Sequence, residues 1–212
     1  SAVNIYVVKS REHNEGAKTP SRLADLSWRY LTDLDTFTNR SGHTQYFTPD
    51  AHEGAWIRFR YRNLGIDGTG ELDGNTYELG YTTVLRNQEP HKHRLSTSVA
   101  YTKNEGHFEG TSGNLGLRDT AISVYDTHVY TPTELTRKAD WKKGTYSYWD
   151  SYLKYHYGKE DYSVTDAITG TGYAADYTRH SVNLSTEYGR VNKLSKDWSV
   201  VPQAQVQVSY LG

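Results

Sequence analysis

The most regular pattern in this sequence is the alternation of apolar and polar residues near its end. From Trp198 to Tyr210 the even positions carry Trp, Val, Pro, Ala, Val, Val and Tyr, whereas the odd positions, apart from Val201, carry Ser or Gln. Successive side chains of a β-strand point to opposite faces, so this segment predicts a strand with one apolar and one polar face. It is long enough to cross the hydrocarbon core of a bilayer, which takes about 9–11 tilted residues.

Six earlier segments alternate in a similar way and predict six further strands. In the first, Ile57 lies on the face opposite to Arg58. In the fourth the phase is open, because either the row with Ile122 or the row with Tyr125 can be the apolar one. Glycine-rich segments between the strands predict turns, and no helical pattern separates them, so we expect an antiparallel meander. The predicted strands span residues 55–64, 75–85, 94–103, 120–130, 146–157 and 177–188, and the predicted turns include Gly65–Gly74 and Asn104–Gly116.

The polar faces of these strands leave two architectures open. A sandwich would bury the apolar faces against each other and leave the charged faces in water. A transmembrane barrel would turn the apolar faces to lipid and the charged faces to a wet lumen. The length of the strands favours an all-β, antiparallel, up-and-down transmembrane β-barrel, of which this sequence contains about seven strands preceded by an α-helix.

The predicted helix lies before the strands. Pro20 and Ser21 indicate its start, with Ser21 as a candidate N-cap, and Gly42 indicates its end. Between them apolar residues recur at spacings of three and four, which is typical of an amphipathic helix with one apolar stripe. The stripe consists of Leu23, Leu26, Tyr30, Leu34 and Phe37.

Composition narrows the class of protein. With 35% hydrophobic residues and a mean hydropathy of −0.80, the sequence has no apolar run that could form a transmembrane helix, but a polar lumen lowers the hydropathy of a barrel as well. The 19 Tyr residues suit strands and membrane interfaces. The net charge of −1 gives no reason to expect nucleic acid. The absence of Cys excludes a disulfide scaffold and thiolate catalysis. Since the chain starts at Ser1 and contains no Met, we interpret it as an internal fragment.

Candidate catalytic and metal residues are few. His91 and His93 share one face of an extended segment and form a possible metal pair, but they lack an evident third ligand and follow Pro90, so we expect an exposed loop. Asp126 and His128 have the residue types of a catalytic pair at a barrel rim, although no nucleophile motif accompanies them. We therefore predict no catalytic residues, no metal site and no cofactor.

Four motifs occur in this order along the chain: Gly54-Ala55-Trp56-Ile57-Arg58, Asn75-Thr76-Tyr77, Lys142-Lys143-Gly144 and Pro202-Gln203-Ala204-Gln205. In this order they resemble the β-domain of autotransporters, the translocators of type V secretion in Gram-negative bacteria. In that family a helix precedes a first strand of the G-x-W-x-R type, and the segment from Leu23 to Phe37 stands in the corresponding place. The family's acidic residue before the last motif is replaced here by Val201.

The resemblance implies a division of the chain and a membrane topology. Residues 1–19 would be the end of a passenger or linker, residues 20–53 the pore helix and its linker, and residues 54–212 the N-terminal part of the barrel. The family's barrel closes with a C-terminal strand that ends in an aromatic residue. This chain stops at Leu211-Gly212, so we expect its last strands to be missing. The resemblance puts the turns within 65–74, 104–119 and 158–176 outside the cell and those within 86–93, 131–145 and 189–197 in the periplasm.

The resemblance also directs a basic stripe into the lumen. Arg58, Arg60 and Arg62 share one strand face, and their like charges repel unless acids or water compensate them. One hypothesis is that they pair with acids and hold the helix in the lumen; the other is that they line a hydrated channel without fixed partners. The candidate acidic partners are Asp25, Asp33, Asp35 and Glu78, and the residues expected to face lipid include Trp198, Val200, Ala204, Val206, Val208 and Tyr210.

The function implied by the resemblance is an outer-membrane translocator that anchors an N-terminal passenger and helps to export it, without catalysis. Its expected partners are its own passenger, outer-membrane lipid and the barrel-assembly machinery, and not nucleic acid. The Asn-Asn junction at which one subgroup cleaves its passenger is missing, so autocleavage is not expected. Two alternatives stay open: a porin-like channel or binding barrel, and a barrel enzyme with a rim Asp/His site.

Overall fold

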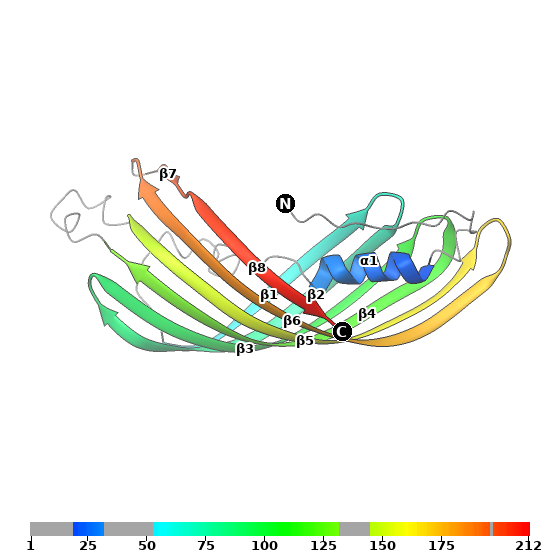
Figure 1. Ribbon diagram of the computed structural model, residues 1–212, viewed down its shortest axis with the longest axis horizontal. Coiled ribbons are helices and arrows are strands. Elements are labelled where there is room, and N and C mark those ends of the chain that lie inside the picture. Colours follow the sequence, from blue (N-terminus) through cyan, green and yellow to red (C-terminus); the bar gives the residue numbers. More distant parts are fainter. Residues whose placement is uncertain (1–18, 32–52, 132–144, 196) are drawn as a thin grey trace.

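The computed structural model describes residues 19–31, 53–131, 145–195 and 197–212, which form one helix and one eight-stranded sheet. Figure 1 shows the sheet bent into a trough with the helix on its concave side. We call this concave side the inner face and the opposite side the outer face. The helix is α1, Thr19–Leu31, and the strands are β1, Gly54–Ile66; β2, Gly70–Gln88; β3, His91–Phe108; β4, Thr111–Tyr130; β5, Tyr146–Asp166; β6, Gly172–Lys193; β7, Ser199–Val200; and β8, Gln203–Leu211.

The strands form the predicted antiparallel meander. Each strand from β1 to β5 pairs with the next one along the chain, and β7 and β8 both pair with β6. In the described part of the chain, β1 pairs only with β2, so the sheet is not closed on itself. The predicted all-β, up-and-down architecture is therefore confirmed as a partial, open sheet.

The predicted turns at Gly65–Gly74 and Asn104–Gly116 are wrong in extent. Strands β2 to β6 have 18 to 22 residues, and most of both segments belongs to paired strands. The β1–β2 connection comprises only residues 67–69, and the β3–β4 connection only Glu109 and Gly110. Main-chain pairing continues through both segments, although their outer positions are polar. The alternation of apolar and polar residues that is typical of a membrane strand therefore ends before the strand does.

The structure settles the phase of β4. Ile122 and Val124 are exposed on the outer face, whereas Tyr125 and Val129 are buried on the inner face. Both faces of this strand carry apolar residues, so the sequence pattern alone could not distinguish them.

The last predicted strand is interrupted at Val201-Pro202, which separates β7 from β8. The register is the same on both sides, because Asn192 faces Val200 and Gly189 faces Gln203. The Arg190 amide still donates to the Pro202 carbonyl at 3.0 Å, but proline has no N–H to donate in return.

α1 begins at Thr19 and not after Ser21, so the predicted N-cap is wrong and Ser21 lies in the first turn. Pro20 is tolerated there because the first backbone N–H groups of a helix have no intrahelical acceptor. Leu34 and Phe37 lie outside the described residues. Within the described residues, no helix is long and apolar enough to cross a membrane.

The inner face carries two apolar clusters separated by a polar belt. The first cluster lies near the β1–β2 and β3–β4 turns and includes the apolar side of α1. The second lies at the other end of the strands and consists of Val129, Tyr146, Tyr148 and Val191. Between the clusters, buried polar residues such as Glu78, Ser123 and Lys154 line the sheet. The first cluster consists of Leu23, Leu26, Tyr30, Leu72, Phe108, Leu115, Leu117, Tyr162 and Val164.

Candidate functional site: the inner face and the helix packed on it

α1 is fixed to the sheet first by Arg22. The Arg22 guanidinium donates hydrogen bonds to the carbonyl of Glu109 at 2.6 Å and to that of Gly68 at 3.2 Å. Both carbonyls belong to the short connections at one end of the sheet, and the Arg22 side chain is buried. A buried guanidinium that donates to two turns places the start of α1 at this end of the trough.

The next contacts of α1 are apolar. Leu23 and Leu26 are each only 1% exposed and belong to the cluster that includes Leu72 and Phe108. Burial of a leucine side chain contributes about 1.5–3 kcal/mol. α1 is therefore held on the inner face by apolar packing as well as by polar contacts.

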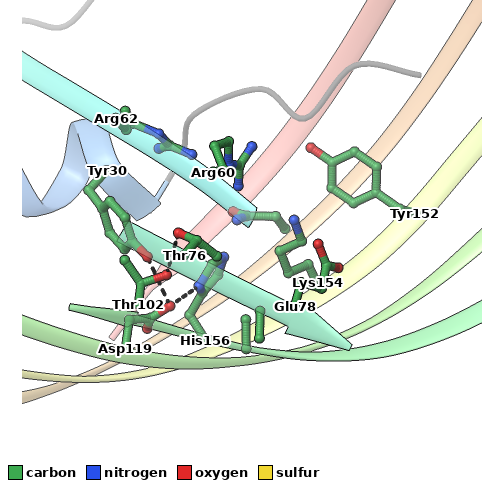
Figure 2. Close-up of a pocket in the computed structure, with 13 residues that line it drawn as sticks. Tyr30, Arg60, Arg62, Thr76, Glu78, Thr102, Asp119, Tyr152, Lys154 and His156 are labelled. Carbon is green, nitrogen blue, oxygen red and sulfur yellow. Dashed lines mark hydrogen bonds and ion pairs between the residues drawn. The ribbon is translucent and has the colours of Figure 1, made fainter. Parts of the chain in front are cut away.

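Tyr30 ends this packed stripe and enters the polar belt. Its hydroxyl lies 3.4 Å from Asp119 Oδ2, and the same carboxylate oxygen lies 2.6 Å from His156 Nδ1. The Arg62 guanidinium lies over the Tyr30 ring, 5.4 Å from its centroid. Figure 2 shows these side chains converging from α1, β1, β4 and β5. The helix thus contributes a phenol to a cluster of one carboxylate, one imidazole and one guanidinium.

Arg58 and Glu78 form the central ion pair of the belt. The two residues face each other in the β1–β2 register, and Arg58 Nε donates to Glu78 Oε2 at 2.8 Å. The other carboxylate oxygen accepts from the Ser98 hydroxyl at 2.6 Å and from the Tyr125 hydroxyl at 2.9 Å. Glu78 is almost completely buried, and donors from three strands compensate its charge.

The belt continues around the sheet through β5. The Lys154 ammonium lies 5.7 Å and 5.3 Å from the ring centroids of Tyr125 and Tyr152. Further along β5, Glu160 Oε2 accepts a hydrogen bond from Arg179 Nε of β6 at 2.9 Å. The cavity between Tyr30 and this belt has a volume of about 30 Å³, which is room for roughly one or two water molecules. This part of the trough is filled by α1 and side chains and does not form a pocket for a metabolite.

Of the acidic partners predicted for Arg58, Arg60 and Arg62, only Glu78 has a side chain among the described residues. Glu78 contacts Arg58, whereas Arg62 lies against the ring of Tyr30. Asp33, Asp35 and the side chain of Asp25 lie outside the described residues. The apolar stripe of α1 was predicted, but the polar contacts that position the helix involve residues that the sequence analysis did not select: Arg22, Asp119 and His156. For Asp119 and His156 the only sequence signal is that both are in phase with the inner rows of their strands.

The outer face is apolar over the middle of the sheet. On β1 the side chains of Ile57, Phe59 and Tyr61 are exposed while the arginines between them point inward. The residues of the last segment that we expect to face lipid are all exposed on this outer face: Trp198, Val200, Ala204, Val206, Val208 and Tyr210. The glutamines between them point inward; Tyr148, for example, lies 3.1 Å from Gln203 Oε1.

The predicted exposed loop at His91 and His93 is wrong, because both residues lie in β3 and are partly buried. They share the outer face with Asp126 and His128, at the end of the sheet opposite to the turns that α1 contacts. A catalytic pair at the mouth of a barrel would need to reach its opening, and Asp126 and His128 point away from it.

Comparison with known proteins agrees with this architecture. The family model described as the autotransporter beta-domain matches residues 55–212. Among solved structures, the sheet is similar to the crystal structure of the β-domain of the Bordetella autotransporter BrkA, with 21% sequence identity and a TM-score of 0.60. That match covers 75% of this chain and 58% of the BrkA chain, so this chain spans little more than half of that domain. No curated protein sequence matches the chain.

Proposed function

Because this chain belongs to the autotransporter β-domain family, we propose that it forms part of an outer-membrane translocator barrel that anchors an N-terminal passenger and helps to export it to the cell surface. The matched family is one of translocator domains and not of enzymes. The proposal includes a location in the bacterial outer membrane, contact of the outer apolar rows with lipid, and insertion by the barrel-assembly machinery.

The observation that carries the proposal is the position of α1. A helix that precedes the first strand lies on the inner face of the sheet, held by Arg22, Leu26 and Tyr30. A chain that leaves the barrel through its lumen must pass this face, and α1 connects β1 to whatever precedes it in sequence. We assign residues 20–53 as the pore helix and its linker, residues 1–19 as the end of the passenger or a linker, and residues 54–212 as barrel.

The two alternative functions receive less support. A porin-like channel or binding barrel needs an open lumen, whereas here α1 packs on the inner face and its Tyr30 enters the polar belt. A rim enzyme needs an Asp–His pair at the barrel mouth, but Asp126 and His128 lie on the outer face. We therefore propose that the barrel has no catalytic turnover of its own.

A surface-exposure assay tests the proposal. An epitope tag is inserted on the N-terminal side of α1 in the full-length protein, which is then expressed in Gram-negative cells. We expect antibody and added protease to reach the tag on intact cells while a periplasmic marker stays protected. A tag that remains inaccessible on cells whose barrel is folded in the outer membrane would contradict the translocator function.

A further inference from the structure

Three histidines and one aspartate form a compact group on the outer face of β3 and β4. His93 and His128 are direct neighbours in the antiparallel register. His91 lies two residues before His93 on β3, and Asp126 lies two residues before His128 on β4. Residues two apart on a strand share a face, so the register brings all four side chains to one patch next to the β2–β3 turn.

The four side chains are joined by short polar contacts. Asp126 Oδ1 lies 2.5 Å from His93 Nε2, and Asp126 Oδ2 lies 3.1 Å from His128 Nε2. His128 Nδ1 in turn lies 2.8 Å from His91 Nε2. The rings of His93 and His128 are stacked at a centroid distance of 4.0 Å. Each oxygen of the carboxylate therefore faces the Nε2 atom of a different imidazole.

We propose that His93, Asp126 and His128 bind one divalent first-row transition metal ion, with Zn²⁺ as the expected ion. One ligand atom from each of the three residues lies within 4.8 Å of the other two. Two imidazole nitrogens and one carboxylate oxygen are a ligand set that Zn²⁺ accepts, with water in a remaining position. Mg²⁺ and Ca²⁺ prefer oxygen ligands and are poorly matched to this set.

The ligand atoms are already close together. At zinc–nitrogen distances of about 2.0–2.1 Å, tetrahedral ligand atoms stand roughly 3.3 Å apart, and the two carboxylate oxygens of Asp126 lie 2.5 Å and 3.1 Å from the imidazole nitrogens of His93 and His128. The stacked rings of the two histidines would rotate so that both nitrogens point at one ion. The ion would replace the protons that now lie between the carboxylate and the two imidazoles. The side chains of His93, Asp126 and His128 are 24%, 42% and 25% exposed, and they lie beside the β2–β3 turn, at the end of the sheet and away from the apolar middle of the outer face, so an ion can reach them.

His91 is a positioning residue for this site. For His128 Nε2 to bind a metal, its proton must lie on Nδ1, and the Nδ1–H then donates to His91 Nε2 at the observed 2.8 Å. Such a hydrogen bond fixes the tautomer and orientation of a ligating histidine. Tyr130 stacks on the His91 ring at a centroid distance of 4.7 Å and holds that ring in place.

A bound ion would add a cross-link between β3 and β4, at the end of the sheet opposite to the contacts of Arg22. An ion that binds only the folded sheet stabilises it. This inference rests on the outer-face geometry alone and does not depend on the translocator function.

Isothermal titration of the detergent-purified, chelator-treated protein with ZnCl₂ tests the inference. We expect one Zn²⁺ ion to bind per chain, with an affinity that excess MgCl₂ does not lower. H93N, D126N and H128N should each weaken binding by at least about 100-fold, and H91N by about 10–100-fold. The matched control is H180N, because His180 is exposed on β6 and bonded to Tyr155, away from the site. Unchanged Zn²⁺ affinity in the three ligand variants, or equal displacement by Mg²⁺, would overturn the site.

A spectroscopic measurement on the unaltered protein covers the case in which a variant does not fold. X-ray absorption at the zinc edge should show two imidazole ligands with zinc–nitrogen distances of about 2.0–2.1 Å. A spectrum with oxygen ligands only would refute the assignment. The fold of each metal-free variant is checked by the shift in electrophoretic mobility on heating, so that loss of binding is scored only on folded protein.

Discussion

Arg58 and Glu78 face each other across β1 and β2, and the carboxylate also accepts hydrogen bonds from Ser98 and Tyr125. The group is nearly excluded from solvent, since the Glu78 side chain is 3% exposed. These contacts explain how one strand tolerates three aligned arginines. Arg58 pairs with the buried Glu78, Arg62 lies over the ring of Tyr30, and all three arginines face the polar belt.

Removal of the buried carboxylate should destabilise the sheet. Glu78→Gln leaves the Arg58 guanidinium without its anionic partner, and breaking a buried ion pair costs about 3–5 kcal/mol. We expect a lower midpoint of urea unfolding in micelles. Arg118→Gln, an exposed arginine on β4, serves as control and should shift the midpoint little. Equal midpoints for Glu78→Gln and the unaltered protein would mean that the pair contributes nothing to stability.

Gly80 should not tolerate a side chain. A Cβ atom at this position would lie 2.1 Å from Cζ2 of Trp56, whose indole also donates to Thr82 Oγ1 at 3.0 Å. Gly80→Ala should cost about 1–3 kcal/mol, as overpacking does, and the cost should shrink when Trp56→Ala is added. Gly172→Ala is the control, because nothing lies within 4 Å of a Cβ there. If the two alanine variants are equally stable, the indole does not pack on Gly80.

Truncation of the α1 contacts should release the helix. Leu26→Ala removes a side chain that is buried against the inner face, and such a change in a core costs about 2–5 kcal/mol. We expect faster labelling of a cysteine placed in α1, a probe that is specific because the chain contains no Cys. Leu194→Ala, at an exposed leucine, should leave the labelling rate unchanged. An unchanged labelling rate in Leu26→Ala would mean that contacts other than that of Leu26 hold α1 on the sheet.

A charge on the outer apolar face should be costly only at membrane depth. Leu153 is exposed at the centre of β5, beside Val124 and Leu184 in register. Leu153→Arg should destabilise the folded barrel in lipid vesicles by about 2–4 kcal/mol. Ile168→Arg, in the β5–β6 turn, should have little effect. A similar effect of both substitutions would argue against lipid contact at Leu153.

The sequence predicted the meander because Ile57, Arg58 and their successors alternate with a period of two, and this alternation comes directly from the geometry of a strand. It missed the apolar cluster around Leu72 and Leu115, since these residues lie in glycine-rich segments that we interpreted as turns. Both are in phase with the inner rows of their strands, which was the available signal.

The contacts of the polar belt could not be predicted in the same way. Asp119 and His156 are 37 residues apart and meet only because the β4–β5 register places them close together. The site of His93 and His128 has the same origin: each histidine has an ordinary sequence context, and only the β3–β4 pairing brings them together.

We propose that the outer rows of the sheet face hydrocarbon and the inner rows face water and α1. Single spin labels at successive positions of β5, with the protein in lipid bilayers, test this assignment of the two faces. Labels at Leu153 and Tyr155 should be relaxed mainly by oxygen dissolved in the bilayer, and labels at Lys154 and His156 mainly by a water-soluble paramagnetic complex. Equal accessibility of both rows to the water-soluble complex, or the reverse periodicity, would contradict the account.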